Sequence, residues 1–272
     1  MLKQEQIDMY RDDGYLVVDK FIDADKIKSL MHRAEHLIEE FDSLSHTTVF
    51  STNEQERTSN EYFIGSADKV RFFFEEGAID DSGNFRVEKS KSINKIGHAQ
   101  HIIDPIYKKV VDSLQFEVIA RQLGLNKPIA IQSMHIFKQP MIGGEVGLHQ
   151  DSTFLYTEPM SCVGFWLALE DATIENGCLQ AIPGGHKYPL KKRFLRSKGG
   201  EMKFEVLDDS EWQEQELEVL EVVAGTMIIL HGQLPHYSAA NKSKQSRQAF
   251  SVHLVDSKCH YPKDNWLQTD LV

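Results

Sequence analysis

The segment Val222-Val223-Ala224-Gly225-Thr226-Met227-Ile228-Ile229-Leu230 joins a turn to an uninterrupted apolar run. A short apolar run that follows turn residues is typical of a β-strand in a protein core. His231 and His236 come after this run, where such a strand would reach the rim of a sheet. The segment therefore predicts a core strand that delivers polar side chains to a sheet edge.

Comparable β-rich runs recur along the chain from about residue 128. Glycine, proline or asparagine clusters separate most of them. The runs cover residues 129–138, 145–148, 162–169, 178–182, 218–223, 226–231 and 248–255. Many short strands divided by turns predict an antiparallel double-sheet barrel or jelly roll.

The first third of the chain has a mainly helical character, apart from a short strand predicted at residues 14–18. Asp23 is expected to cap a helix, because apolar residues recur at steps of three and four from Ile27 to Phe41. This spacing gives the helix one buried stripe.

A second helix is expected from Asp104-Pro105 to Gly124, because a capping residue, a first-turn proline and a glycine mark its two ends. Its predicted buried stripe is Ile106, Val110, Val111, Leu114, Val118 and Leu123.

Between the two helices, residues 71–74 predict either a strand or a lid over a pocket, and residues 77–92 resemble a turn-rich hairpin. We find neither a linker nor a repeat, so we expect a single domain over residues 1–272. Its fold class is mainly β with flanking helices. The helical buttress lies mainly in residues 1–125, and the jelly-roll core mainly in residues 128–256.

The composition limits the partners and the compartment. Lys and Arg number 30 against 41 Asp and Glu, so the formal net charge is −11 at pH 7. No nucleic-acid polymer is expected as a partner, because such proteins usually carry a basic stripe. Three cysteines without metal-motif spacing favour a reducing compartment. No signal-like start or long apolar run is present, so we expect a cytoplasmic protein without a membrane partner.

The strongest chemical signal is His149-Gln150-Asp151. In an extended segment the side chains at i and i+2 point to the same side, so His149 and Asp151 can aim at one point. His231 and His236 are both candidates for a third ligand. Arg247 favours His236, because a hairpin from residue 236 to the strand around 247 would place the arginine beside the site.

Two imidazoles and one carboxylate can occupy one face of an iron ion and leave the opposite face open, as in non-haem Fe(II) oxygenases. Zinc would accept the same ligands. Arg247 favours the oxygenase, because a guanidinium can pair with a carboxylate of a small-molecule cosubstrate. A zinc hydrolase needs no such partner.

Several motifs resemble the phytanoyl-CoA dioxygenase family over almost the whole chain. They are Gln132-Ser133-Met134-His135-Ile136-Phe137-Lys138, His149-Gln150-Asp151, Gly164-Phe165-Trp166, Asn176-Gly177-Cys178-Leu179, Ile182-Pro183-Gly184-Gly185-His186, His236-Tyr237-Ser238 and Arg247-Gln248-Ala249. The runs 68–75 and 91–98 resemble most closely the domain-containing protein 1 branch of that family.

This resemblance implies a double-stranded β-helix that uses Fe(II), 2-oxoglutarate and O2. It implies that His149, Asp151 and His236 bind iron. Arg247 and Ser238 would hold the distal carboxylate of 2-oxoglutarate. The residues implied to line the cosubstrate are Lys95, Met134, Gln150 and Trp166. His135 and Gly185 stand where relatives can carry other residues, so they are expected to face the substrate.

The predicted reaction couples decarboxylation of 2-oxoglutarate to oxidation of a small organic substrate. Hydroxylation is favoured, because halogenating relatives replace the carboxylate that Asp151 supplies here. Two other classes stay open: a zinc-dependent hydrolase, and a non-catalytic binding or regulatory protein that keeps the fold.

A basic run from Lys187 to Lys198 stands out in this acidic chain. Its interpretation is open between a solvated loop and a site for an anionic substrate group. In the second case Lys191, Lys192 and Arg193 would bind the substrate.

Overall fold

Two antiparallel sheets form the core of the structure, a computed structural model that describes residues 1–42, 48–50, 58–80 and 84–270. The seven-stranded sheet has the order β1 (Tyr15–Val18), β11 (Met227–His231), β6 (Val163–Ala168), β13 (Arg247–Asp256), β4 (Pro128–Lys138), β3 (Ile93–His98) and β2 (Val70–Phe74). The four-stranded sheet has the order β10 (Glu218–Leu220), β7 (Leu179–Ala181), β12 (His236–Ser238) and β5 (Val146–His149). This arrangement confirms the predicted jelly-roll fold.

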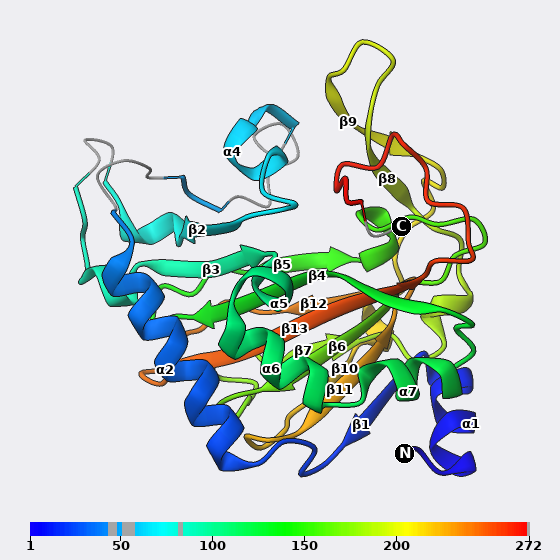
Figure 1. Cartoon of the computed structure of the whole chain (residues 1–272), viewed down its shortest axis with the longest axis horizontal. Coiled ribbons are helices and arrows are strands. Elements are labelled where there is room, and N and C mark those ends of the chain that lie inside the picture. Colours follow the sequence, from blue (N-terminus) through cyan, green and yellow to red (C-terminus); the bar gives the residue numbers. More distant parts are fainter. Residues whose placement is uncertain (43–47, 51–57, 81–83, 271–272) are drawn as a thin grey trace.

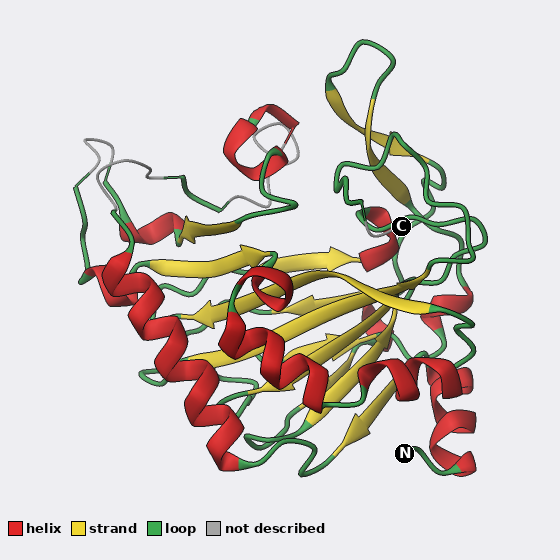
Figure 2. Cartoon of the chain, viewed as in Figure 1, coloured by secondary structure: helices red, strands yellow, loops and turns green. Residues whose placement is uncertain are grey.

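Most of the α-helices among the described residues cover one face of the larger sheet (Figures 1 and 2). The described α-helices are α1 (Gln4–Asp13), α2 (Ala24–Glu40), α4 (Glu61–Ile64), α5 (Gln100–Ile103), α6 (Pro105–Ser113) and α7 (Phe116–Gln122). Of these, α2, α6 and α7 lie in front of the sheet in Figure 1, whereas α4 lies beyond its β2 edge. The other face of the larger sheet is therefore left for the smaller sheet and the cavity.

Strand β11 shows why the opening apolar run has no polar side. Met227 and Ile229 pack in the core beneath the helices, and Ile228 and Leu230 pack between the two sheets. A strand covered on both faces needs apolar residues at every position. Gly225 precedes it with φ +90°, and a Cβ there would lie 2.9 Å from the backbone oxygen of Ile22.

Helix α2 forms where the sequence predicts it. The Asp23 side chain accepts a hydrogen bond from the Lys26 amide, which caps the first turn. Leu30, Ala34 and Ile38 form the buried part of the predicted stripe.

The second predicted helix is in fact two helices. Gln115 has φ 54° and ψ 27°, a left-handed conformation that ends α6 and starts α7 in a new direction. Phe116, Ile119 and Ala120 are therefore buried, while Val118, which the continuous stripe placed inside, is 40% exposed. The prediction of one helix was wrong because single-residue breaks leave the apolar spacing almost unchanged.

Residues 71–74 belong to strand β2, so the strand alternative is confirmed. Within residues 77–92, an antiparallel bridge joins Ile79 to Phe85, and residues 81–83 lie outside the described part of the chain. Between β7 and β10, a hairpin that was not predicted from the sequence pairs β8 (Lys192–Arg196), which lies in the basic run, with β9 (Met202–Val206).

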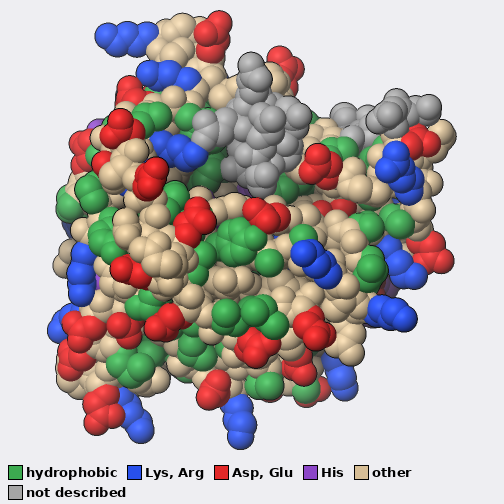
Figure 3. All heavy atoms as spheres, turned by 180° about the vertical axis from the view of Figure 1, so that it is seen from behind, with side chains coloured by type: hydrophobic (Ala, Val, Ile, Leu, Met, Phe, Trp, Pro, Cys, Tyr) green, Lys and Arg blue, Asp and Glu red, His purple; other side chains and the backbone are tan. Residues whose placement is uncertain are grey.

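No helix among the described residues is long and apolar enough to cross a membrane. On the face turned away from the helices, acidic side chains are spread among basic and apolar ones (Figure 3).

Candidate active site

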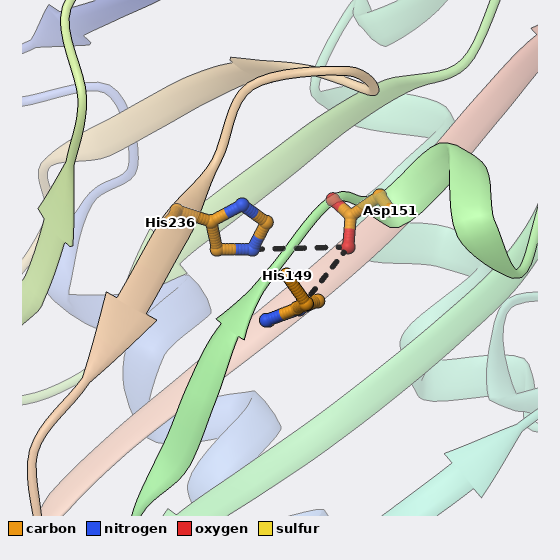
Figure 4. Close-up of side chains that lie close together, drawn as sticks. All are labelled: His149, Asp151 and His236. Atoms are coloured by element: carbon orange, nitrogen blue, oxygen red, sulfur yellow. Dashed lines mark ion pairs between the residues drawn. The ribbon is translucent and has the colours of Figure 1, made fainter. Parts of the chain in front are cut away.

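The structure brings His149, Asp151 and His236 together, as predicted (Figure 4). One ligand atom from each residue lies within 4.8 Å of the others. His149 and His236 are directly paired residues of β5 and β12, so their side chains lie side by side. Asp151 begins a short 3-10 turn just beyond β5 and points to the same side as His149.

Hydrogen bonds to the backbone set both imidazoles for metal binding. Nδ1 of His149 lies 2.8 Å from the Gly147 carbonyl oxygen, and Nδ1 of His236 lies 2.9 Å from that of Leu234. A carbonyl only accepts, so each Nδ1 must carry the proton and each Nε2 presents a lone pair. The two Nε2 atoms lie 3.6 and 3.8 Å from Oδ1 of Asp151. This donor set fits a divalent transition metal.

The local electrostatics keep His236 and Asp151 in the protonation states that a metal needs. Burial lowers the pKa of His236 to about 4, with His149 adding to the effect, so the ring is neutral at pH 7. Burial alone would raise the pKa of the Asp151 carboxyl. His253 and His236 nevertheless hold that pKa well below its usual range, so the carboxylate is ionised.

His231 is not part of this cluster. It packs against Tyr10 and His186, with ring centres 6.1 and 4.9 Å away, and its Nδ1 accepts a hydrogen bond from the Gln233 amide. The structure therefore separates the two candidates that the sequence left open and places His236 in the metal cluster.

Arg247 is buried at the first residue of β13 with 2% of its surface exposed. One terminal nitrogen donates to the Gly177 carbonyl at 2.8 Å and to Ser238 Oγ at 2.9 Å, while Nε has no partner. Among the described residues, no carboxylate forms an ion pair with it. A buried guanidinium without a counter-ion is costly, which points to an anionic ligand at this position.

Gly177 explains part of the Asn176-Gly177 motif. It has φ +82°, and a Cβ there would lie 2.4 Å from the Ala239 backbone oxygen. This close approach requires glycine. The Gly177 carbonyl accepts from Ser238 Oγ as well as from Arg247, so it fixes both predicted carboxylate-binding residues.

Lys138 is a further buried cation next to Arg247, and it was not predicted from the sequence. It is the residue of β4 that pairs with Arg247, and its Nζ donates to the Gly144 carbonyl at 2.6 Å. Burial, followed by the neighbouring Arg247, lowers the pKa of Lys138 to about 7. Only the register of β4 against β13 reveals this neighbour.

A cavity of about 250 Å³ connects the metal cluster with Arg247 and Ser238. We call this part the inner half; Met134 and Trp166 line it, and Lys95 also lines the cavity, as the resemblance implied. The Lys95 ammonium lies 4.0 Å from the Met134 sulfur, and the Arg247 guanidinium lies 5.4 Å from the centre of the Trp166 ring.

Three residues that were expected to contact ligands do not line the cavity, and Gln150 is the first. Its amide donates to the Gln233 and Pro189 carbonyls, and its oxygen accepts from the Lys191 amide. It points away from its neighbours His149 and Asp151 because side chains alternate along an extended segment. Gln150 therefore holds the loops behind the metal cluster rather than the cosubstrate.

His135 and Gly185 are likewise corrected. His135 is fully buried on the helix side of the larger sheet, where it bonds the Tyr107 hydroxyl at 2.7 Å and Gln248 at 3.0 Å. A Cβ on Gly185 would lie 2.8 Å from Pro235 Cδ, so this glycine permits close packing.

The three basic residues of the predicted substrate site have different surroundings. Lys191 is buried, and its ammonium pairs with Asp208 and bonds Ser210. Arg193 pairs with Asp264 at 2.8 Å. Only Lys192 of the three lines the cavity.

The outer half of the cavity is aromatic, and it was not predicted from the sequence. Phe63 of α4, Phe154, Phe204 of β9 and Trp266 line it. Phe63 and Trp266 stack with ring centres 4.7 Å apart, and a bridge between Leu195 and Asn265 ties the hairpin to the C-terminal segment. In Figure 1, α4, β8, β9 and the red C-terminal segment all lie on one side of the sheets. In the sequence, the aromatic residues within these otherwise polar connecting segments were the signal that could have predicted the aromatic wall.

Comparison with known proteins agrees with this geometry. The phytanoyl-CoA dioxygenase (PhyH) family model matches residues 10–249. The chain belongs to the phytanoyl-CoA dioxygenase family. A phytanoyl-CoA dioxygenase of Arabidopsis thaliana is 46% identical over 268 residues, which are 98% of this chain and 94% of that protein. Phytanoyl-CoA dioxygenase domain-containing protein 1 of Bos taurus is 43% identical over 98% of this chain and 95% of its own length.

The fold is also shared with solved structures. The epimerase SnoN, crystallised in complex with Fe3+, alpha ketoglutarate and nogalamycin RO, superposes with a TM-score of 0.65 at 14% identity, over 95% of this chain and 86% of that one. Family membership, the His-Asp-His cluster and the buried arginine identify the chain as a 2-oxoglutarate-dependent dioxygenase with iron as its metal.

Proposed function

We propose that the enzyme hydroxylates a small organic molecule at a carbon held in the outer half of the cavity. One oxygen atom of O2 enters the new hydroxyl group, and the other enters succinate. 2-Oxoglutarate is oxidised as it loses CO2, so electrons and atoms balance without a further reductant. The observation that carries this proposal is Arg247, a buried cation that lacks a counter-ion within the described structure.

The spacing of the inner half supports 2-oxoglutarate as the anion. His236 and Ser238 are two residues apart on β12, and Ser238 Oγ lies 2.9 Å from Arg247. An i, i+2 step along a strand covers about 7 Å. A five-carbon diacid can therefore place one carboxylate on Arg247 and reach the metal cluster with its keto acid end.

The residues divide the work of the reaction. Ferrous iron, when bound by His149, Asp151 and His236, supplies the redox chemistry with O2 and the keto acid. Arg247 and Ser238 orient the distal carboxylate through directional hydrogen bonds. The apolar and aromatic lining keeps water from the reacting atoms.

The shape of the outer half limits the substrate. Its walls are mainly aromatic, and the whole cavity measures about 250 Å³, part of which the cosubstrate fills. A compact, largely apolar group fits this space, so we propose a small molecule as the partner. We also propose that the oxidation takes place in the cytosol. Lys192 is the candidate for contact with a negative group of that molecule.

The decisive experiment follows succinate by mass spectrometry while the Fe(II)-loaded enzyme is offered a metabolite library with 2-oxoglutarate and O2. We expect one compound class to stimulate succinate release and to gain one oxygen atom from 18O2. Arg247→Leu is the matched control, because it keeps the metal ligands and removes the carboxylate partner.

Two results would contradict the proposal. Hydrolysis of a library compound with zinc, independent of 2-oxoglutarate, would indicate the hydrolase alternative. Tight binding of a compound without any succinate, in enzyme that holds both iron and 2-oxoglutarate, would indicate a non-catalytic binding protein.

A further inference from the structure

His253 lies in direct contact with the metal cluster, although neither its sequence context nor the His-x-Asp spacing marks it. Its Nε2 is 3.2 Å from Oδ2 of Asp151. The other carboxylate oxygen, Oδ1, faces His149 and His236 at 3.6 and 3.8 Å. The two oxygens of Asp151 thus have different neighbours: one faces the metal ligands, and the other faces His253.

The sheet places His253 there through strand register. It lies on β13, where it pairs with Gly164 of β6 and with Gln132 of β4. It is 5% exposed and lines the cavity. Strand positions are rigid, so the imidazole meets Asp151 in a fixed orientation.

Gly164 provides the space for this contact. A Cβ at this position would lie 3.3 Å from Oδ2 of Asp151 and 3.3 Å from Nε2 of His253. Such contacts are tighter than ordinary packing, so any larger residue would push the pair apart. Gly164 and His253 together hold Oδ2 of Asp151 in place.

We propose that His253 is a positioning residue that holds Oδ2 of Asp151 and so makes Asp151 a ligand through Oδ1 alone. Nε2 carries a proton in this contact whether the ring is neutral or charged, since the carboxylate oxygen can only accept. A carboxylate free to rotate could offer both oxygens to the metal. Holding one of them keeps coordination positions open for the cosubstrate and O2. This inference rests on the proposed metal site and extends it to a residue outside the ligand set.

The test compares His253→Leu with His253→Gln, whose side-chain amide can still donate to Oδ2. Co(II) is the probe metal, with and without 2-oxoglutarate, in the full-length protein. For His253→Leu we expect Co(II) affinity to fall about 10- to 100-fold and the visible Co(II) spectrum to change, whereas His253→Gln should stay close to the parent. Gly164→Ala should shift both readouts in the same direction by a smaller amount.

His135→Leu is the matched control, because it removes a second buried histidine from the neighbouring strand without touching the cavity. It should lower the melting temperature and leave Co(II) affinity and spectrum unchanged. Parent-like Co(II) binding in folded His253→Leu would overturn the proposal. An equal loss in His135→Leu, or no rescue in His253→Gln, would also overturn it. These readouts do not depend on turnover. A failure of the proposed hydroxylation would be recognised separately, because the parent enzyme would then release no succinate.

Discussion

The inner half of the cavity is made by strands, and the outer half by the connections between them. His149 and His236 are paired residues of β5 and β12, and Arg247, the first residue of β13 in the other sheet, bonds Ser238 of β12. Phe63 and Trp266 come from a short helix and from the segment after β13. The strands of the inner half can hold one fixed geometry for the metal and the cosubstrate. The connections of the outer half can vary without disturbing that geometry.

This difference suggests a separation of tasks. Strand register sets the distances that the reaction needs, and a change of side chain there should affect chemistry. Under the proposed function the aromatic connections hold the substrate, so a change there should affect substrate affinity alone. The predictions that follow test whether the two halves are separable in this way.

The largest effect is expected at the metal cluster. His236→Ala should lose most iron and all succinate formation, because a two-ligand site binds divalent metals weakly. His231→Ala is the control, since it removes a half-buried histidine of β11 that packs against His186 rather than the cluster. Iron content by elemental analysis and succinate release are the measurements. Loss of iron in His231→Ala with retention in His236→Ala would reverse the assignment.

The next effect is expected at Arg247. Arg247→Leu should keep iron and weaken 2-oxoglutarate binding by about 2–5 kcal/mol, the range for removing one partner of a buried charged pair. Arg247→Lys should restore only part of it, because an ammonium cannot reproduce the bidentate geometry. Calorimetric titration of the anaerobic metal-loaded protein with 2-oxoglutarate measures both variants. Unchanged affinity in Arg247→Leu would remove the cosubstrate from this end of the cavity.

A smaller effect is expected in the outer half. Trp266 is 2% exposed, lines the cavity and has a ring nitrogen without a hydrogen-bond partner. Trp266→Phe keeps the aromatic stack and removes this donor, so the Michaelis constant for the prime substrate should rise about 5- to 30-fold, or roughly 1–2 kcal/mol. The Michaelis constant for the keto acid cosubstrate should not change. Trp212→Phe is the control, because Trp212 lies under Lys191 and does not line the cavity. Equal shifts in both Michaelis constants would show that the halves are coupled.

The same contrast explains what the sequence could predict. The β-rich runs and the His-x-Asp geometry follow from alternation, which is a local property. The hairpin expected from residue 236 to the strand around 247 was wrong, because β12 and β13 lie in different sheets, although Arg247 still bonds Ser238 of β12. His236 was chosen over His231 partly because it lies past the end of the apolar run, and the structure places it on a separate strand, β12, where it pairs with His149 of β5. The left-handed residue Gln115, which divides the predicted helix, escaped prediction, since nothing in the apolar spacing marks it.

The missed and misassigned residues share a physical cause. Lys138 and His253 reach the site through cross-strand pairing, which depends on register between segments more than 100 residues apart. Gln150 was placed in the cavity by family resemblance, although its position between two inward side chains turns it outward. Lys191 and Arg193 looked free in a basic run, but Asp208 and Asp264 neutralise them. Such partners cannot be seen in a linear sequence.

The smallest effect concerns protons at the inner half. The pKa of Lys138 is lowered to about 7, by burial first and then by Arg247, so at pH 8 most of the enzyme carries a neutral lysine. A bound dicarboxylate on Arg247 would favour the ammonium form and raise that pKa. Binding of 2-oxoglutarate at pH 8 should therefore take up close to one proton, and at pH 6 almost none, because the lysine is already charged. Affinity should accordingly weaken as the pH rises above 7.

Calorimetry in buffers of different ionisation enthalpy measures the proton uptake. Lys138→Met should abolish this uptake and weaken 2-oxoglutarate binding by about 1 kcal/mol. Proton uptake that persists in Lys138→Met would place the titrating group elsewhere.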